Sequence, residues 1–151
     1  MNRPSQQGLE PQAGLRYWTI ATILVTALLW CSSLALPVWD TRSDHTGEWD
    51  TVPGLVPALL GFLGLFAMCP AWFANLFLIL LWIKLFRGRL AGFSLSMVAL
   101  ALAASAYILP GIYGDNDEAV IVGRRIGFYI WLGSFVIANG CPSAVRFRSI
   151  R

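Results

Sequence analysis

The stretch that decides the fold is residues 90–110, LAGFSLSMVALALAASAYILP, which carries no charged side chain. About twenty residues of helix, each rising about 1.5 Å, match the hydrocarbon core of a bilayer, which is about 30 Å thick. Since no side chain in this stretch requires water, the sequence predicts a transmembrane helix over residues 90–109.

One face of this predicted helix consists of small side chains. They recur at alternating intervals of four and three residues, at Gly92, Ser96, Ala99, Ala103 and Ala106. Lipid tails are as apolar as leucine, so helices in a bilayer associate through close van der Waals contact across such faces. We therefore expect these residues to pack against neighbouring helices.

The composition extends this conclusion to the whole chain. Of its 151 residues, 57% are hydrophobic and 13% are charged, whereas about 25% of a typical soluble domain is charged. A soluble protein of this length could not bury so much apolar surface, but a membrane protein leaves it against lipid. The formal net charge is +3, yet the basic residues do not cluster with aromatic ones, so no nucleic-acid partner is expected.

Three further apolar segments predict three more spans, at residues 17–36, 68–86 and 122–141. The predicted fold class is all-α: a polytopic membrane protein with a four-helix bundle domain over residues 17–141. Residues 1–16 predict a disordered cytoplasmic tail, and residues 142–151 a basic cytoplasmic tail. Because Ser33-Leu34-Ala35 resembles a signal-peptidase site, cleavage of the first span remains an alternative.

Residues 54–86 form an apolar run that is too long for one perpendicular span. Pro70 is the best point at which to divide it, because proline suits the first turn of a helix. In one interpretation, residues 54–67 form an extra short helix, interfacial or re-entrant, before the second span. In the other, the whole run is one long tilted helix that is kinked at Pro70.

The loop at residues 37–53, PVWDTRSDHTGEWDTVP, is polar and acidic. Its two Trp-Asp pairs around a glycine are consistent with a short hairpin or with an irregular cap on the membrane surface. Trp39 and Trp49 are expected to be exposed in it. The candidate interaction residues are Trp39, Trp49, Trp72 and Asn75.

Two glycines of the last predicted span, Gly123 and Gly127, form a GxxxG pair. This motif lets two helices approach closely, so both residues are predicted to lie at a helix-packing face.

No catalytic motif is present in the sequence: there is no nucleophile elbow, phosphate loop, HExxH or pair of carboxylates within a span. The three cysteines form no CxxC pair or Cys/His cluster, and a lone histidine such as His45 in an acidic loop is usually solvated. We therefore expect no enzyme activity, no cofactor and no metal.

The basic residues are distributed unevenly between the two predicted sides. Eight of the eleven lie with the two tails and the turn at Lys84, and three lie with the acidic loops. The positive-inside rule places the richer side in the cytoplasm. The sequence thus predicts a multi-pass protein of the cell inner membrane with both termini cytoplasmic.

The predicted function is that of an accessory or interaction subunit without catalytic activity. Its expected partners are membrane lipids and either another membrane protein or further copies of this chain. The alternative is a small transporter or channel that acts as an oligomer, with a pore lined by the hydroxyl face of the first span, at Thr19, Thr22, Thr26 and Ser33.

Two short elements carry a resemblance to a known group of proteins. They are Gly61-Phe62-Leu63-Gly64-Leu65-Phe66 and Ala71-Trp72-Phe73-Ala74-Asn75. With the tryptophan-containing loop before them, they make residues 17–140 resemble a loose group of small bacterial four-span inner-membrane proteins, mostly of unassigned function. The resemblance implies location and topology rather than an activity.

Overall fold

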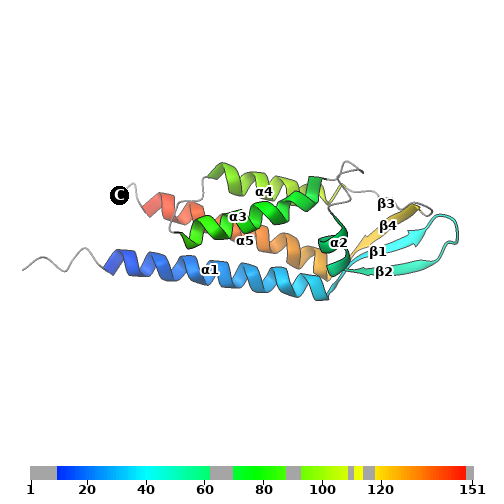
Figure 1. The fold of residues 1–151 in the computed structure, drawn as a ribbon, viewed down its shortest axis with the longest axis horizontal. Coiled ribbons are helices and arrows are strands. Elements are labelled where there is room, and N and C mark those ends of the chain that lie inside the picture. The colour runs from blue at the N-terminus through cyan, green and yellow to red at the C-terminus, as the bar shows by residue number, and fades with distance from the viewer. Residues whose placement is uncertain (1–9, 62–69, 88–92, 109–110, 114–117, 149–151) are drawn as a thin grey trace, which may run out of the picture.

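The computed structural model describes residues 10–61, 70–87, 93–108, 111–113 and 118–148. Four long helices lie side by side, and a β-sheet projects from one end of them (Figure 1). The helices are α1 (Glu10–Ala35), α3 (Phe73–Phe86), α4 (Phe93–Ser105) and α5 (Ile126–Arg148). The chain is mostly helical, as the sequence predicts.

The sheet is the feature that the sequence did not predict. It has four strands in the order β2-β1-β4-β3, and every neighbouring pair is antiparallel. The strands are β1 (Pro37–Ser43), β2 (Trp49–Pro53), β3 (Gly111–Tyr113) and β4 (Glu118–Arg124). The all-α prediction was therefore wrong at this end of the molecule, because segments of the two predicted loops pair with each other.

The first two strands form a hairpin at residues 37–53, one of the two forms expected for this loop. Gly47 lies in its turn with a φ of 71°, which glycine adopts without steric strain. The Ser43 N–H donates to the Glu48 carbonyl oxygen at 3.0 Å. The hairpin is thus closed by a glycine turn.

Strand β4 occupies residues that the sequence analysis assigned to the last span. Its centre is Val120, Ile121 and Val122, and such β-branched side chains favour strands. The helix begins only at Ile126. The last span was expected to begin either near Val120 or at Ile126; the earlier start was wrong and the later one is observed. The two were hard to separate because a short apolar run has the same composition in a strand and in a helix.

The other helix boundaries also differ from those expected. Helix α1 begins at Glu10, so residues 10–16 are helical rather than part of a disordered tail. Helix α5 continues to Arg148 and includes most of the predicted basic tail. Helix α3, which corresponds to the second predicted span, is preceded by the 3-10 turn η3 (Pro70–Trp72). Helix α4 lies within the predicted span 90–109. Residues 1–9, 68–69 and 149–151 lie outside the described part.

A separate short helix, α2 (Leu55–Leu60), precedes the second long helix. The Trp72 indole N–H donates to the Ala58 carbonyl oxygen at 3.1 Å, and a Cβ added at Gly61 would lie 2.6 Å from Trp72 Cδ1. In one continuous helix, Ala58 and Trp72 would be about 21 Å apart, and Gly61 and Trp72 about 16 Å. The interpretation as one long kinked helix was therefore wrong, because Ala58 and Gly61 both lie against Trp72.

The helices are arranged so that α1 packs along α5, and α4 contacts both α3 and α5. Contact between α1 and α3 is less extensive. The start of α1, the end of α3, the start of α4 and the end of α5 all lie at the end of the bundle away from the sheet (Figure 1). Both ends of the described chain are thus on the same side, opposite the sheet.

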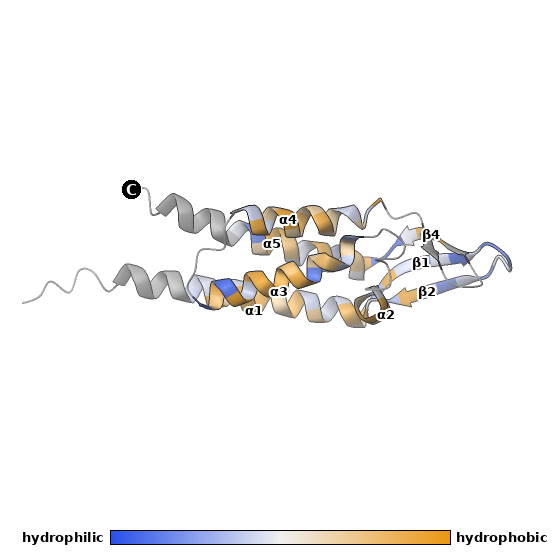
Figure 2. Ribbon diagram, turned by 45° about the horizontal axis from the view of Figure 1, so that its top comes forward, coloured by the Kyte–Doolittle hydropathy of each residue, from blue (hydrophilic) through white to orange (hydrophobic). Residues whose placement is uncertain are grey.

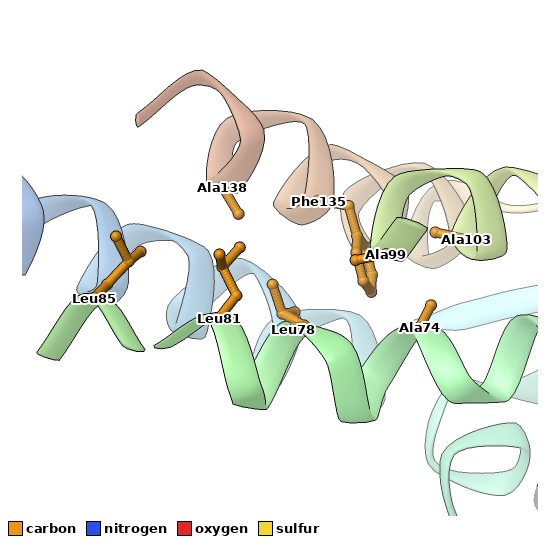
Figure 3. Close-up of a cluster of buried hydrophobic side chains, with 8 residues drawn as sticks. All are labelled: Ala74, Leu78, Leu81, Leu85, Ala99, Ala103, Phe135 and Ala138. Atoms are coloured by element: carbon orange, nitrogen blue, oxygen red, sulfur yellow. The ribbon is translucent and has the colours of Figure 1, made fainter. Parts of the chain in front are cut away.

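The interior of the bundle combines small and large apolar side chains. Four alanines, Ala74, Ala99, Ala103 and Ala138, are at most 1% exposed and form one cluster with Leu78, Leu81, Leu85 and Phe135 (Figure 3). Many other large apolar side chains point outward: Leu24 is 59% exposed, Leu28 66% and Val136 55%. Hydrophobic residues dominate the helices, whereas the far end of the sheet is hydrophilic (Figure 2).

Among the described helices, one segment is both long and apolar enough to cross a membrane. It is Tyr17–Ala35, with 19 residues. Three other helical segments are apolar but shorter, namely Pro70–Phe86, Ser94–Ser105 and Ile126–Gly140.

Candidate functional site

The small-residue face predicted on residues 90–109 lies inside the bundle. Ser96, Ala99, Ala103 and Ala106 are each at most 3% exposed. Ala99 and Ala103 pack against side chains of α3 and α5 (Figure 3), and Gly92 lies outside the described residues. The described part of this face thus lies where α4 contacts neighbouring helices.

The glycine pair Gly123 and Gly127 does not form a helical GxxxG motif. Gly123 lies in β4, where a Cβ would be 3.4 Å from Asp40 Oδ2. Gly127 lies in the first turn of α5, where a Cβ would be 2.6 Å from the Pro37 carbonyl oxygen. The prediction of a helix-helix motif was wrong, although Gly127 does allow close approach between α5 and the start of β1.

Asn75 connects three helices. Its Oδ1 accepts a hydrogen bond from Trp30 Nε1 of α1 at 3.0 Å and another from Trp131 Nε1 of α5 at 2.9 Å. Trp72, the neighbouring candidate, instead holds α2 through its bond to Ala58. Both candidates thus form contacts within the same chain, and their role as interaction residues stays a prediction.

Sequence reasoning missed the two indoles that bind Asn75. A signal was available, since a carboxamide in an apolar helix needs a partner. Trp30 and Trp131 each lie several residues inside an apolar segment, away from the ends where tryptophan anchors a helix to a membrane interface. Which indoles reach Asn75 depends on the packing of three helices, which the sequence alone does not specify.

The hydroxyl face of α1 is also engaged within the bundle. Thr26 and Ser33 are 0% and 2% exposed. Thr26 Oγ1 accepts from Trp82 Nε1 at 2.9 Å and donates to the Thr22 carbonyl oxygen at 2.8 Å. Ser33 Oγ donates to the Trp30 carbonyl oxygen at 2.6 Å. Thr26 and Ser33 therefore face other helices rather than an aqueous pore through the monomer.

A second amide, Asn139, joins α5 to α4. Its Nδ2 donates to the carbonyl oxygens of Ser96 at 3.0 Å and Phe135 at 2.9 Å. This amide thus acts as a donor to backbone, whereas the carboxamide of Asn75 acts as an acceptor from side chains.

Trp39 lies at the junction of the sheet and the bundle. It is 9% exposed and packs with Val38, Ala71, Ala106 and Phe128. Its Nε1 has no hydrogen-bond partner among the described residues. The expectation that Trp39 is exposed was wrong, because the side chain lies where the sheet meets the helices and is packed against Ala106 and Phe128.

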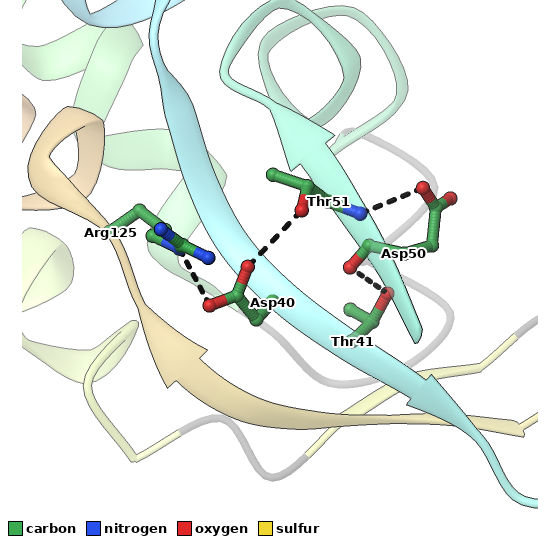
Figure 4. Close-up of polar contacts among 5 residues, drawn as sticks. All are labelled: Asp40, Thr41, Asp50, Thr51 and Arg125. Carbon is green, nitrogen blue, oxygen red and sulfur yellow. Dashed lines mark hydrogen bonds and ion pairs between the residues drawn. The ribbon is translucent and has the colours of Figure 1, made fainter. Parts of the chain in front are cut away.

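A chain of polar contacts crosses the sheet near the bundle (Figure 4). Arg125 Nε donates to Asp40 Oδ2 at 2.6 Å, and Thr51 Oγ1 donates to Asp40 Oδ1 at 3.2 Å. Asp50 Oδ1 in turn accepts from the Thr51 backbone N–H at 2.7 Å. Asp40 therefore links β1 to β2 and to the residue between β4 and α5.

The hairpin tip carries the one candidate interaction residue that is exposed. Trp49, at the start of β2, is 64% exposed. It lies directly opposite Arg42 in the β1–β2 register, and the Arg42 Cζ is 6.0 Å from the centre of the indole ring. The same end of the hairpin carries three exposed carboxylates, those of Asp44, Glu48 and Asp50. We call these five residues the hairpin surface.

Metal-binding chemistry is not assembled in the part of the chain that the structure describes. No group of three or more His, Cys, Asp or Glu residues there lies close enough to hold a metal ion. His45, Asp44 and Glu48 are neighbours in sequence but do not form such a group.

Comparison of the chain with known protein families, with curated proteins and with solved structures finds no match. The candidate site must therefore be interpreted from its own residues, and the hairpin surface is the part of it that other molecules can reach.

Proposed function

We propose that the protein is a multi-pass membrane protein of the bacterial inner membrane that serves as an interaction subunit. In this proposal, the four long helices lie in the bilayer, and the sheet stands outside it and binds a partner protein. The observation that carries the proposal is that small side chains make up much of the bundle interior, whereas many large apolar side chains face outward.

Burial supports the membrane part of this proposal. The interior contains many small residues, such as Ala74, Ser134 and Thr26, beside a few large ones such as Leu78 and Leu81, all at 0% exposure. Leu24, Leu28, Leu80 and many similar side chains face outward. A water-soluble bundle does the opposite, because burial of large apolar side chains is what stabilises it. Lipid as the outer solvent removes that requirement and favours small residues at helix interfaces.

Helix length is compatible with this arrangement. Helix α3 with η3 is an apolar segment of 17 residues, Pro70–Phe86, that includes Asn75 and Lys84; at about 1.5 Å per residue it reaches about 26 Å. A slightly short helix is accommodated by local thinning of the bilayer or by snorkelling of a flanking residue. Lys84 in the last turn of α3 is exposed and can extend its ammonium group toward water.

Charge supports the orientation of the protein. Lys84 and Arg87 are exposed at the end of the bundle that also holds the start of α1 and the end of α5. Asp44, Glu48 and Asp50 are exposed on the sheet at the other end. The positive-inside rule then favours a cytoplasmic position for both termini and an outer position for the sheet.

The transport alternative receives no support from the described contacts. Thr26 and Ser33, half of the hydroxyl face proposed to line a pore, are buried between helices with their hydroxyl groups hydrogen-bonded. An oligomeric pore would need this face to be accessible. We therefore retain the interaction subunit as the proposed function.

A labelling experiment tests the orientation. In a variant that lacks the three native cysteines, Glu48→Cys and Arg87→Cys each place one thiol at an exposed position on opposite ends of the molecule. A membrane-impermeant maleimide is expected to label Glu48→Cys in spheroplasts and Arg87→Cys only after lysis. Labelling of both from the same side, or release of the protein from membranes by alkaline carbonate, would contradict the membrane proposal.

Gentle solubilisation tests the interaction part. Purification in a mild detergent is expected to return the chain as a complex with a second protein. A pure monomer with neither protein nor lipid attached would count against an interaction subunit.

A further inference from the structure

We infer that the hairpin surface, formed by Arg42, Asp44, Glu48, Trp49 and Asp50, docks a basic segment of a partner protein against its side. The inference rests on the proposed function and specifies the partner's chemistry and its mode of binding. It excludes a partner that extends the sheet as a fifth strand at β2.

Trp49 is the centre of this surface, because it is exposed and has Arg42 beside it. The side chain is 64% exposed and lies at the start of β2, and the far end of the sheet is hydrophilic (Figure 2). Arg42 lies against its ring from the opposite strand, which reduces the rotamer freedom that binding would otherwise cost. Exposed tryptophan and arginine are the residue types that most often dominate binding energy at protein interfaces.

The charge of the surface determines the kind of partner. Asp44, Glu48 and Asp50 oppose Arg42 alone, which leaves a net charge of −2 on the tip. Lysine or arginine of a partner can meet these carboxylates and can also stack on the open side of the Trp49 indole. A second copy of this chain would bring two acidic tips together, and an anionic membrane would also be repelled.

Strand addition at β2 is disfavoured by the backbone. Ser43 N donates to Glu48 O across the hairpin, so in the alternating antiparallel pattern the next outward-facing N–H groups are those of Trp49 and Thr51. The Thr51 N–H is already bonded to the Asp50 carboxylate at 2.7 Å (Figure 4). Pro53, the next outward position, has no N–H. Such features protect an edge strand from pairing with another chain.

The test measures binding of oligolysine, with oligoglutamate as the charge control, to the full chain in phosphatidylcholine nanodiscs. Oligolysine is expected to bind in a salt-sensitive manner, and oligoglutamate is not. Trp49→Ala should weaken binding at least about tenfold. Trp18→Ala removes a tryptophan of similar exposure, 65%, at the other end of the molecule and should leave the affinity unchanged. Equal affinities for Trp49→Ala and Trp18→Ala overturn the inference.

Asp50 distinguishes the two modes of binding. Asp50→Asn keeps an oxygen that can accept from the Thr51 N–H but removes the charge, and it should weaken oligolysine binding about fivefold. Asp50→Ala also frees the Thr51 N–H. Side-on docking predicts that Asp50→Ala weakens binding about as much as Asp50→Asn, whereas strand addition predicts that it strengthens binding. Stronger binding therefore overturns the inference.

A photo-crosslinking amino acid at position 49 extends the test to cells. Crosslinks are expected to a protein segment of net positive charge, mapped by mass spectrometry, and position 18 should not give them. Crosslinks from position 49 to lipid, to a second copy of this chain or to an acidic segment overturn the inference. If a mild purification still returns a complex in that case, the proposed function stands; if the chain is a bare monomer, the proposed function fails as well.

Discussion

Replacement of Asn75 by leucine should destabilise the bundle more than its size suggests. The variant keeps a similar side-chain volume but removes the oxygen that accepts from both Trp30 Nε1 and Trp131 Nε1. Both indole N–H groups then lose their partner in a half-buried position. The two hydrogen bonds that are lost join α3 to α1 and to α5.

The magnitude follows from the two donors that are left unpaired. A buried donor without a partner costs about 1–3 kcal/mol in proteins generally, and hydrogen bonds between helices in bilayers contribute about 0.6 kcal/mol on average and at most about 1.7 kcal/mol. Trp30 and Trp131 are only half-buried, so we take about 1 kcal/mol for each. Asn75→Leu should therefore lower the free energy of unfolding by about 2 kcal/mol.

Asn139→Leu is the comparison variant, because it removes two hydrogen bonds that Asn139 Nδ2 donates to backbone. The accepting carbonyl oxygens of Ser96 and Phe135 lie within helices, and a helical carbonyl retains its bond to the N–H four residues later. The loss of these two bonds leaves no buried donor unpaired on the acceptor side and is expected to cost less than about 1 kcal/mol.

The assay is unfolding in mixed micelles by titration with sodium dodecyl sulfate, followed by circular dichroism. A double-mutant cycle with Trp30→Phe isolates one of the two bonds, because phenylalanine has no N–H to leave unpaired. In the Trp30→Phe background, the cost of Asn75→Leu should fall by about half. Equal costs for Asn75→Leu and Asn139→Leu, or no coupling to Trp30→Phe, would refute this reasoning.

Two further predictions concern close packing, and the free energy of unfolding from the same titration checks both. Gly54→Ala would place a Cβ 2.1 Å from the backbone oxygen of Ser33, so the free energy of unfolding should fall by about 1–3 kcal/mol or more. Its control is Gly133→Ala, where a Cβ meets nothing within 4 Å. This variant should be neutral or stabilising by up to about 1 kcal/mol. Ala103→Leu inserts a large side chain at a 0% exposed position and should cost about 1–3 kcal/mol, whereas Ala101→Leu on the exposed side of α4 should change little. Equal changes for Gly54→Ala and Gly133→Ala would contradict the close approach of Gly54 to Ser33. Equal changes for Ala103→Leu and Ala101→Leu would contradict the burial of Ala103.

Features that depend on local patterns could be predicted from the sequence. The face with Ser96, Ala99, Ala103 and Ala106 was identified from its spacing, because helical periodicity places residues three and four apart on one side. Pro70 was identified as the point where the apolar run divides, because proline fixes φ and lacks an N–H. The hairpin was recognised as one possibility from the residues around Gly47.

Features that depend on distant contacts could not be predicted. Strand β4 pairs with β1 across more than half of the chain, and its Val120-Ile121-Val122 centre is as consistent with a buried helix as with a strand. Trp39 of β1 lies at the junction of the sheet and the bundle and is buried there. The sequence analysis expected this residue to be on the surface. Of the two tryptophans in the hairpin, Trp49 remains exposed, and it lies further from the bundle.

The sequence by itself determined where apolar helices occur, which face of α4 is small, and how charge divides between the two ends. These properties follow from composition and from the helical period, and no other part of the chain is needed to read them. The tertiary structure alone decided that two polar loops build one sheet, that Asn75 receives two indoles, and that Trp49 rather than Trp39 faces outward. Each of these depends on which segments meet in space, and side chains distant in sequence carry no local signal of their meeting.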